Sequence, residues 1–375
     1  MEIVKKLADE IGVRYGGSEK EEQAARFVYQ YLQNKGLEVE QQKIQVLGWE
    51  QISPPQAEIL LPKPCKLSCA PFMYSGSTKN QGITGRLIKV GKFFLTPGSF
   101  EWIKYALLSP DDQYKSYLVA RPDGPPIPVP NHGIHFPYSA PTVVIGAEEA
   151  ETLNQLLTTP QEVVCKIKTE SRYLEACFIK NIIATLHGYL SKTVIISAHH
   201  DSPFGSPGAV DNASGVEALL RVTEYLAGTK PKYTLKFISF GGEEPYLYGS
   251  RYFVRDLKEK EKLQDIVLNI NLDCVAQEKN IKIYCGPEDL RKNVQKLFDV
   301  HSCFGGKKVQ YGPPQRIADD YAFSEEGIAT VLFFYWPYPQ YHLPTDNPQI
   351  VSEKSMQDTV KTVMLILDNL DRLFS

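Results

Sequence analysis

Four apolar runs of strand length dominate the second half of this chain and constrain its fold more than any other feature. They are TVIISA, YTLKFISF, IVLNINLD and IATVLFFYW. These runs lack a strict alternation of apolar and polar residues, as strands buried on both faces should. Helical patterns separate several of them, for example ASGVEALLRVTEYLAG. Strands that alternate with helices predict an α/β fold, with a mostly parallel mixed sheet between two layers of helices.

The first segment of the chain has a helical pattern. Ser18 and Glu21 have the spacing of a capping box, which predicts that a helix begins there. Gly36 is placed to end that helix, and the strand-like stretch LEVEQQKIQVL follows it.

The middle of the chain differs in composition from the segments on either side. Between about Trp49 and Glu170 prolines cluster, as in SPPQAEILLPKP, and the strand-like pieces are short. This composition favours a separate β-rich module with long loops. We therefore predict a discontinuous main domain formed by residues 1–48 and 171–375. Residues 49–170 would form an inserted β-rich module. We expect this module to act as a lid that restricts access to a functional site in the main domain.

Charge and composition exclude several classes of protein. The 375 residues carry a formal net charge of −3 and show no run rich in Lys or Arg, so the electrostatic footprint of a nucleic-acid-binding protein is missing. No stretch approaches the roughly 20 apolar residues that span a bilayer, so we expect no membrane partner. The seven cysteines, together with a start (MEIVKKLADEIG) that lacks a secretory signal, lead us to expect reduced thiols in a cytoplasmic protein.

Acidic or histidine side chains follow each of the four apolar runs. Sites in such sheets form where the strands end at their carboxyl side, so these groups should converge. Imidazole and carboxylate ligands without thiolates suit zinc, or a harder ion such as manganese or cobalt. Five ligands exceed what one catalytic zinc uses, and two ions that share one carboxylate fit them better. The five candidates are His199, Asp211, one residue of the pair Glu243-Glu244, Asp273 and His342, with Asp211 as the natural bridge.

Two local patterns separate neighbouring residues by role. In an extended chain His199 and Asp201 lie on one side and His200 lies on the other. Asp201 can then accept a hydrogen bond from the second nitrogen of His199 and fix the ring. The adjacent carboxylates Glu243 and Glu244 repel each other unless a cation lies between them. One of the two can bind a metal ion while the other takes a proton from the water that the ion activates.

Several stretches together resemble peptidase family M28, a family of aminopeptidases with two catalytic zinc ions. The matching stretches are IGVRYGGSEKEEQAARFVYQYLQNKGLEVE, SAHHDS, PGAVDNASGV, FISFGGEEPYLYGS, NLDCVA and YHLPTDN. The resemblance implies a metal-dependent exopeptidase. It would hydrolyse N-terminal residues from peptide substrates through a water activated by two zinc ions per chain.

The resemblance also implies which residue would hold which ion. His199 and Asp273 would hold one zinc ion, and Glu244 and His342 would hold the other. Asp211 would bridge the two.

Further roles implied by the resemblance concern catalysis. Asp201 would orient His199, and Glu243 would be the general base. Tyr321, in the stretch RIADDYAFSEEGIATV, would help to stabilise the oxyanion. The inserted module has a looser resemblance to the protease-associated domain that some members carry at this point.

Three alternatives stay open from the sequence. A glutaminyl cyclase, an M28-like transferase, would bind a single zinc ion. A carboxypeptidase-type member that cleaves acidic C-termini would need a basic pocket, for which Arg251 and Arg316 are the candidates. A non-catalytic binding protein on the same scaffold would lack some of the ligands, and none is missing here. The preferred side chain and the oligomeric state, a homo-oligomer included, also stay open.

Overall fold

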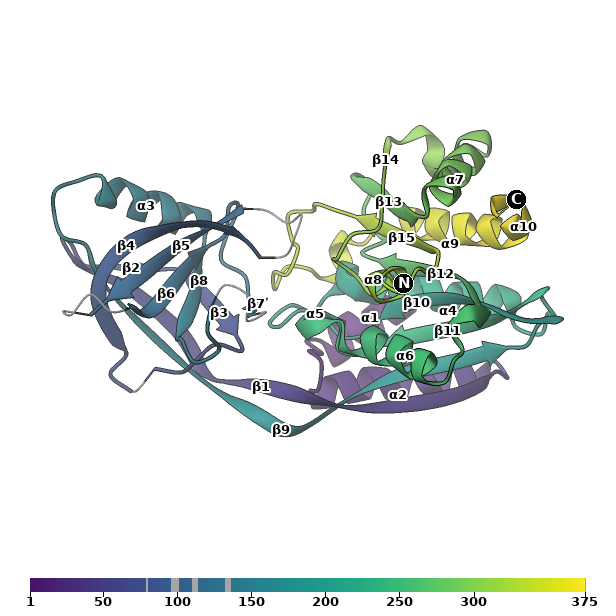
Figure 1. The fold of residues 1–375 in the computed structure, drawn as a ribbon, viewed down its shortest axis with the longest axis horizontal. Coiled ribbons are helices and arrows are strands. Elements are labelled where there is room, and N and C mark those ends of the chain that lie inside the picture. The colour runs from purple at the N-terminus through teal and green to yellow at the C-terminus, as the bar shows by residue number, and fades with distance from the viewer. Residues whose placement is uncertain (79, 96–100, 110–113, 132–135, 375) are drawn as a thin grey trace. The chain divides into compact units, whose positions relative to one another are not determined.

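The computed structural model describes residues 1–78, 80–95, 101–109, 114–131 and 136–374 (Figure 1). The chain divides into two compact units. Unit 1 comprises Met1–Val46 and Cys177–Ser375, and unit 2 comprises Leu47–Ala176. Two long strands, β1 (Glu38–Leu61) and β9 (Val164–Leu186), each contain a boundary between the units.

Unit 1 contains a mixed and mostly parallel sheet. Besides β1 and β9, its strands are β10 (Leu190–His199), β11 (Tyr233–Phe240), β12 (Ile266–Asp273), β13 (Ile281–Gly286), β14 (Val309–Gly312) and β15 (Thr330–Tyr335). Their order across the sheet is β14-β13-β15-β12-β10-β11-β9. Strand β10 is parallel to β11 and β12, and β12 is parallel to β15. Strands β9 and β13 run antiparallel to their neighbours β11 and β15.

Helices cover both faces of this sheet, which confirms the predicted α/β class (Figure 1). The covering helices include α4 (Ser214–Leu226), α9 (Glu353–Asp368), α6 (Tyr248–Glu259) and α8 (Asp320–Ser324). On β10, Val194 and Ile196 pack in the cluster that contains α4 and α9, whereas Ile195 packs with α6 and α8. All three side chains are fully buried. Because the strand has no solvent-facing side, its sequence shows no polar alternation.

The remaining helices of unit 1 are short, except for α2 (Glu19–Asn34) and α7 (Glu288–Val300). Helix α2 begins where the sequence predicts, since the Ser18 hydroxyl accepts a hydrogen bond from the Glu21 N–H at 3.1 Å. None of the helices among the described residues is long and apolar enough to span a bilayer. The short elements are α1 (Glu2–Lys5), η1 (Lys6–Ile11), η2 (Ala209–Ala213), α5 (Glu243–Tyr246), η3 (Leu263–Asp265), η4 (Cys303–Gly306), η5 (Pro348–Ile350) and α10 (Leu370–Leu373).

Unit 2 is rich in β-strands. Strand β4 pairs with β9 and β5, β5 pairs with β6, and β8 lies between β6 and β3. A core of its own, which includes Leu87, Leu107, Leu118 and Val143, is fully or almost fully buried. Its elements are β2 (Cys65–Leu67), β3 (Cys69–Met73), β4 (Ile83–Phe94), β5 (Glu101–Leu108), β6 (Tyr114–Ala120), β7 (Val129–Pro130), β8 (Thr142–Ile145) and α3 (Ala147–Leu157).

Candidate metal centre

The carboxyl ends of β10, β11, β12 and β15 meet at one edge of the sheet in unit 1, because these strands are parallel and in register. His199 ends β10 and Asp273 ends β12. Glu243 and Glu244 begin α5, directly beyond β11, and His342 lies in the loop that follows β15. Side chains that lie far apart in the sequence therefore converge at this edge.

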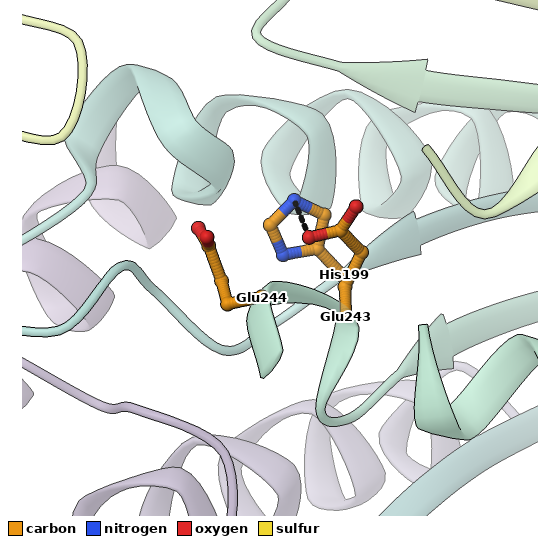
Figure 2. Close-up of side chains that lie close together, drawn as sticks. All are labelled: His199, Glu243 and Glu244. Atoms are coloured by element: carbon orange, nitrogen blue, oxygen red, sulfur yellow. Dashed lines mark ion pairs between the residues drawn. The ribbon is translucent and has the colours of Figure 1, made fainter. Parts of the chain in front are cut away.

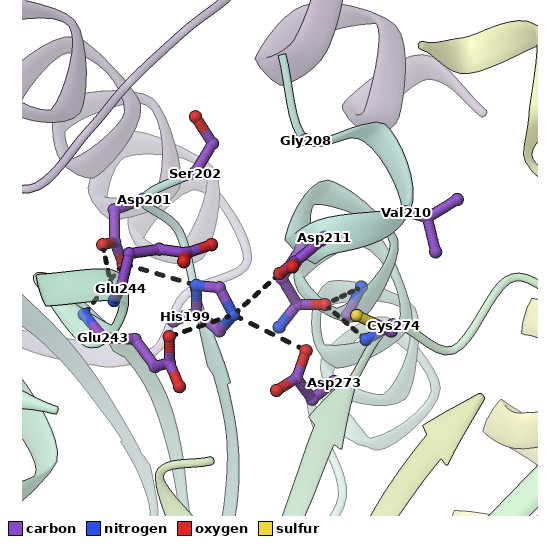
Figure 3. Close-up of polar contacts among 12 residues, drawn as sticks. His199, Asp201, Ser202, Gly208, Val210, Asp211, Glu243, Glu244, Asp273 and Cys274 are labelled. Atoms are coloured by element: carbon purple, nitrogen blue, oxygen red, sulfur yellow. Dashed lines mark hydrogen bonds and ion pairs between the residues drawn. The ribbon is translucent and has the colours of Figure 1, made fainter. Parts of the chain in front are cut away.

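Asp211 lies between the two histidines. Its Oδ1 is 3.4 Å from Nε2 of His199, and its Oδ2 is 3.3 Å from Nε2 of His342. On one side Asp273 Oδ1 lies 3.6 Å from His199 Nε2 (Figure 3), and on the other Glu244 Oε2 lies 3.6 Å from His342 Nε2. His199, Asp211 and Asp273 thus form one group, and Asp211, Glu244 and His342 form a second, with the ligand atoms of each within 4.8 Å of one another. The two groups share Asp211 alone.

Glu243 lies beside these groups without belonging to either. Its Oε2 is 4.0 Å from His199 Nε2, and it gathers with His199 and Glu244 in a third set within 4.8 Å (Figure 2). Each of the two groups that share Asp211 has three candidate ligands without Glu243.

The cluster is buried and strongly acidic. Burial raises the pKa of Glu243 and of Glu244 well above their ordinary values, and neighbouring carboxylates add to this effect. Burial alone would also raise the pKa of Asp211, but His199 and His342 hold it below its ordinary value. Burial likewise opposes the charge of His199, yet the carboxylates around it, Glu243 first, raise its pKa well above the usual range. Positive charge bound between these carboxylates would therefore stabilise their ionised form.

Metal ions fit the donor atoms that the residues present. His199 Nε2, Glu244 Oε1 and Asp273 Oδ1 are buried and form no hydrogen bond with another described residue. Buried polar atoms without partners are rare, so each calls for an explanation such as an ion. The donors are imidazole nitrogens and carboxylate oxygens, with no thiolate among the three groups. This donor set suits zinc.

Two of the residues at the cluster have strained backbones. His342 has φ of 61° and Cys274, directly after Asp273, has φ of 53°, in the left-handed region that non-glycine residues rarely adopt. The Cys274 N–H donates to Oδ1 of Asn212 at 3.2 Å, a bond that fixes this turn. Such strain, about 1–3 kcal/mol per residue, concentrates at functional sites.

Asp201 links the two halves of the cluster through one carboxylate. Its Oδ1 lies 3.3 Å from Nδ1 of His199 and also accepts the Glu243 N–H at 3.1 Å. Its Oδ2 accepts the Glu244 N–H at 3.2 Å. The same side chain therefore contacts a candidate ligand and binds the turn that carries both glutamates (Figure 3), while its role in orienting His199 stays a prediction.

Replacing Asp201 with asparagine should weaken zinc binding about 10- to 100-fold, because an amide offers one acceptor where the carboxylate offers two. Competition with a chelating dye measures this affinity. The control is Asp256→Asn, which removes a carboxylate on α6 that pairs with Lys260 just beyond the helix. Zinc affinity equal to that of the wild type in Asp201→Asn would show that Asp201 does not support His199.

His200 points to a different environment from His199. Its Nε2 is 2.9 Å from Glu21 Oε1 and its Nδ1 is 2.9 Å from the Ser239 hydroxyl, and all three residues are buried. The alternation along an extended strand predicts this separation of the two histidines.

Among the described residues, Tyr321 makes none of the close contacts that join the cluster. Tyr321 is half-buried in α8, with the Arg316 guanidinium 5.9 Å from the centre of its ring. Arg251 has a local partner as well, since its Nη2 lies 3.5 Å from Glu325 Oε2. The oxyanion role of Tyr321 and a basic pocket formed by these arginines both stay predictions.

Two buried charged side chains that no motif singled out, Arg14 and Asp346, contact the segment that carries Asp211. Both lie inside stretches that resemble family M28, IGVRYGG and YHLPTDN. The signal that could have identified them is a charged residue inside a stretch that otherwise resembles the family. Arg and Asp are rarely buried unless they have partners, so a buried one points to a specific contact.

Comparisons with known proteins agree with this description. Residues 181–367 match the model of peptidase family M28. Aminopeptidase YwaD of Bacillus subtilis is 30% identical over 239 residues, which are 58% of this chain and 48% of the relative. Human carboxypeptidase Q is 25% identical over 283 residues, which are 64% of this chain and 57% of the relative. This chain thus spans about half the length of the curated relatives it matches.

A solved structure has the same fold over almost the whole chain. The aminopeptidase from Aneurinibacillus sp. strain AM-1 superposes with a TM-score of 0.76 at 23% sequence identity, covering 98% of this chain and 92% of that one. The fold is therefore the mixed α/β fold of that structure, and here a cluster of histidines and carboxylates lies at the edge of the sheet. The chain belongs to peptidase family M28.

Proposed function

We propose that this protein is a zinc-dependent aminopeptidase that holds two zinc ions per chain. His199 and Asp273 would hold one ion, Glu244 and His342 the other, and Asp211 would bridge them. The observation that carries the proposal is the position of Asp211, whose two oxygens face different histidines at 3.4 and 3.3 Å. A carboxylate in this position suits a pair of ions better than a single one. Manganese or cobalt could take the place of zinc with the same donors.

The residues around the ions have separate tasks in peptide hydrolysis. Bound zinc ions polarise a carbonyl group and lower the pKa of water. Glu243 accepts a proton from the attacking water and returns it to the leaving amine. Burial, the largest cause, raises the pKa of Glu243 above its ordinary value and so strengthens it as a base. Asp201 keeps Glu243 and His199 in place through its hydrogen bonds and its contact with the ring.

The substrates we infer are short peptides with an unblocked N-terminus. The relative in Bacillus subtilis and the superposed structure are both named aminopeptidases, which supports this choice. The relative named carboxypeptidase Q supports an exopeptidase acting at the other end as the second candidate. The inserted module, its action as a lid, a cytoplasmic location and a homo-oligomer stay predictions.

A matched panel of peptides tests the proposal. A tripeptide with a free amine should be hydrolysed at least about 100-fold faster, in kcat/KM, than its N-acetylated form, because a site built around a free amine rejects a blocked one. Amidation of the C-terminus should have little effect. The reverse pattern would identify a carboxypeptidase. Cyclisation of N-terminal glutamine, with one zinc ion per chain, would identify a glutaminyl cyclase.

A further inference from the structure

Asp211 is carried by a short segment, residues 207–211, that no regular helix fixes. Gly208 has φ of 58°, and Asp211 has φ of −111° and ψ of 90°, far from helical values. Figure 3 shows Gly208, Val210 and Asp211 along this segment. Buried backbone in such a conformation needs hydrogen-bond partners from outside the segment.

Arg14 supplies partners for the carbonyl groups of this segment. Its side chain is fully buried, and its Nη1 and Nη2 donate to the carbonyl oxygens of Pro207 and Gly208 at 2.5 and 2.9 Å. Its Nε donates to the His200 carbonyl oxygen at 2.6 Å. One planar guanidinium thus joins the end of the strand that presents His199 to the segment that presents Asp211.

Asp346 supplies partners for the amide groups of the same segment. It is fully buried, and its Oδ1 accepts the Val210 N–H at 2.8 Å while its Oδ2 accepts the Asp211 N–H at 3.1 Å. The Tyr338 hydroxyl donates to Oδ2 at 3.0 Å. Asp346 follows His342 in the loop after β15, so it also couples the two candidate ligands His342 and Asp211.

Arg14 binds carbonyl groups of the segment, whereas Asp346 binds its N–H groups. Within the part of the chain that the structure describes, no carboxylate forms an ion pair with Arg14, whose guanidinium binds carbonyl groups instead. Burial lowers the pKa of Arg14 to about 10, so it stays charged at neutral pH. Its positive charge therefore also offsets part of the negative charge of the carboxylates near it, Asp201 first among them.

We propose that Arg14 and Asp346 are positioning residues that fix Asp211 between the two metal ions. Arg14 lies outside the stretch, residues 181–367, that matches the family model, so the N-terminal segment completes the centre. The inference rests on the proposed function for its two-ion site. It predicts an effect on the binding of the metal ions themselves, and only through that an effect on catalysis.

The test titrates the metal-free full chain with cobalt(II), followed by its absorption spectrum, and with zinc in competition with a chelating dye. Arg14→Lys keeps the charge but loses the planar fork, and Asp346→Asn leaves one acceptor for two N–H groups. In both variants we expect at least one ion to bind about 10- to 100-fold more weakly than in the wild type. In peptide hydrolysis kcat should fall with KM little changed, and added zinc should restore kcat.

Arg221→Gln is the matched control, since Arg221 is a mostly buried arginine that binds Glu217 within helix α4. It should lower the melting temperature without changing the affinity for metal. Tight binding of both ions by Arg14→Lys and Asp346→Asn, with a lower melting temperature alone, would overturn the proposal. So would a single ion per chain in the wild type. Weaker metal binding in the two variants would support it even if the wild type hydrolyses no peptide, which would refute the proposed function alone.

Discussion

Replacing Glu243 with glutamine should lower kcat for a tripeptide by about 100- to 10,000-fold while both zinc ions stay bound. Glutamine has almost the same shape, but its amide cannot accept the proton of the attacking water. Glu243 lies 4.0 Å from His199 and outside the two groups that share Asp211, so the substitution should leave both groups intact. The measurement combines kcat with zinc content determined on the same sample by atomic emission.

Glu244→Gln is the matched control for this prediction. It makes the same chemical change one residue away, but Glu244 Oε2 lies 3.6 Å from His342 Nε2 in the group that includes Asp211. We expect this variant to lose zinc affinity together with turnover. Turnover near the wild-type rate in Glu243→Gln would refute its role as the base, and loss of zinc from that variant would make Glu243 a ligand instead.

The sheet of unit 1 could be predicted from the sequence because its central strands are buried on both faces. Full burial leaves a local mark, an unbroken apolar run such as Val194–Ile196, that needs no knowledge of distant residues. Strand β4 of unit 2 lacks this mark, since it alternates between buried and exposed positions over much of its length. Its pairing also depends on distant chain segments, as in the contact of Ile83 with Ile167. Composition predicts that such a unit is β-rich, but not the order of its strands.

The candidate site could be predicted only as far as its residues follow strands. His199 and Asp273 end strands, so their convergence follows from parallel pairing. Glu21 shows the limit, because its spacing from Ser18 suggests a local cap, yet its carboxylate pairs with His200 Nε2 at 2.9 Å. Arg14 shows the same limit, since its partners lie almost two hundred residues away. Partners of buried charges are set by tertiary packing, which local patterns do not record.

Removing the metal ions with a chelator should abolish hydrolysis and lower the melting temperature by about 10 °C. Without cations, the carboxylates of Asp211, Glu244 and Asp273, whose side chains are almost fully buried, repel one another. A ligand present at a thousand times its Kd stabilises the folded state by about 4 kcal/mol. In a domain of this size that corresponds to about 2–4 °C for each kcal/mol. Zinc should restore both activity and melting temperature, whereas magnesium should restore neither.

This destabilisation should grow as the pH rises from about 5 to 8. In the metal-free protein burial raises the pKa of Glu243 and Glu244 well above their ordinary values. Burial also raises the pKa of Asp319, a fully buried residue directly before α8, to about 7. A carboxyl group whose pKa is higher in the folded state stabilises that state at low pH, and this contribution is lost as the pH rises through the folded pKa. Zinc binding has the opposite dependence, since its ligands must be deprotonated. The difference in melting temperature between zinc-loaded and metal-free protein, measured by calorimetry, should therefore widen with pH. A difference that stays constant or narrows would contradict a buried carboxylate cluster that metal ions neutralise.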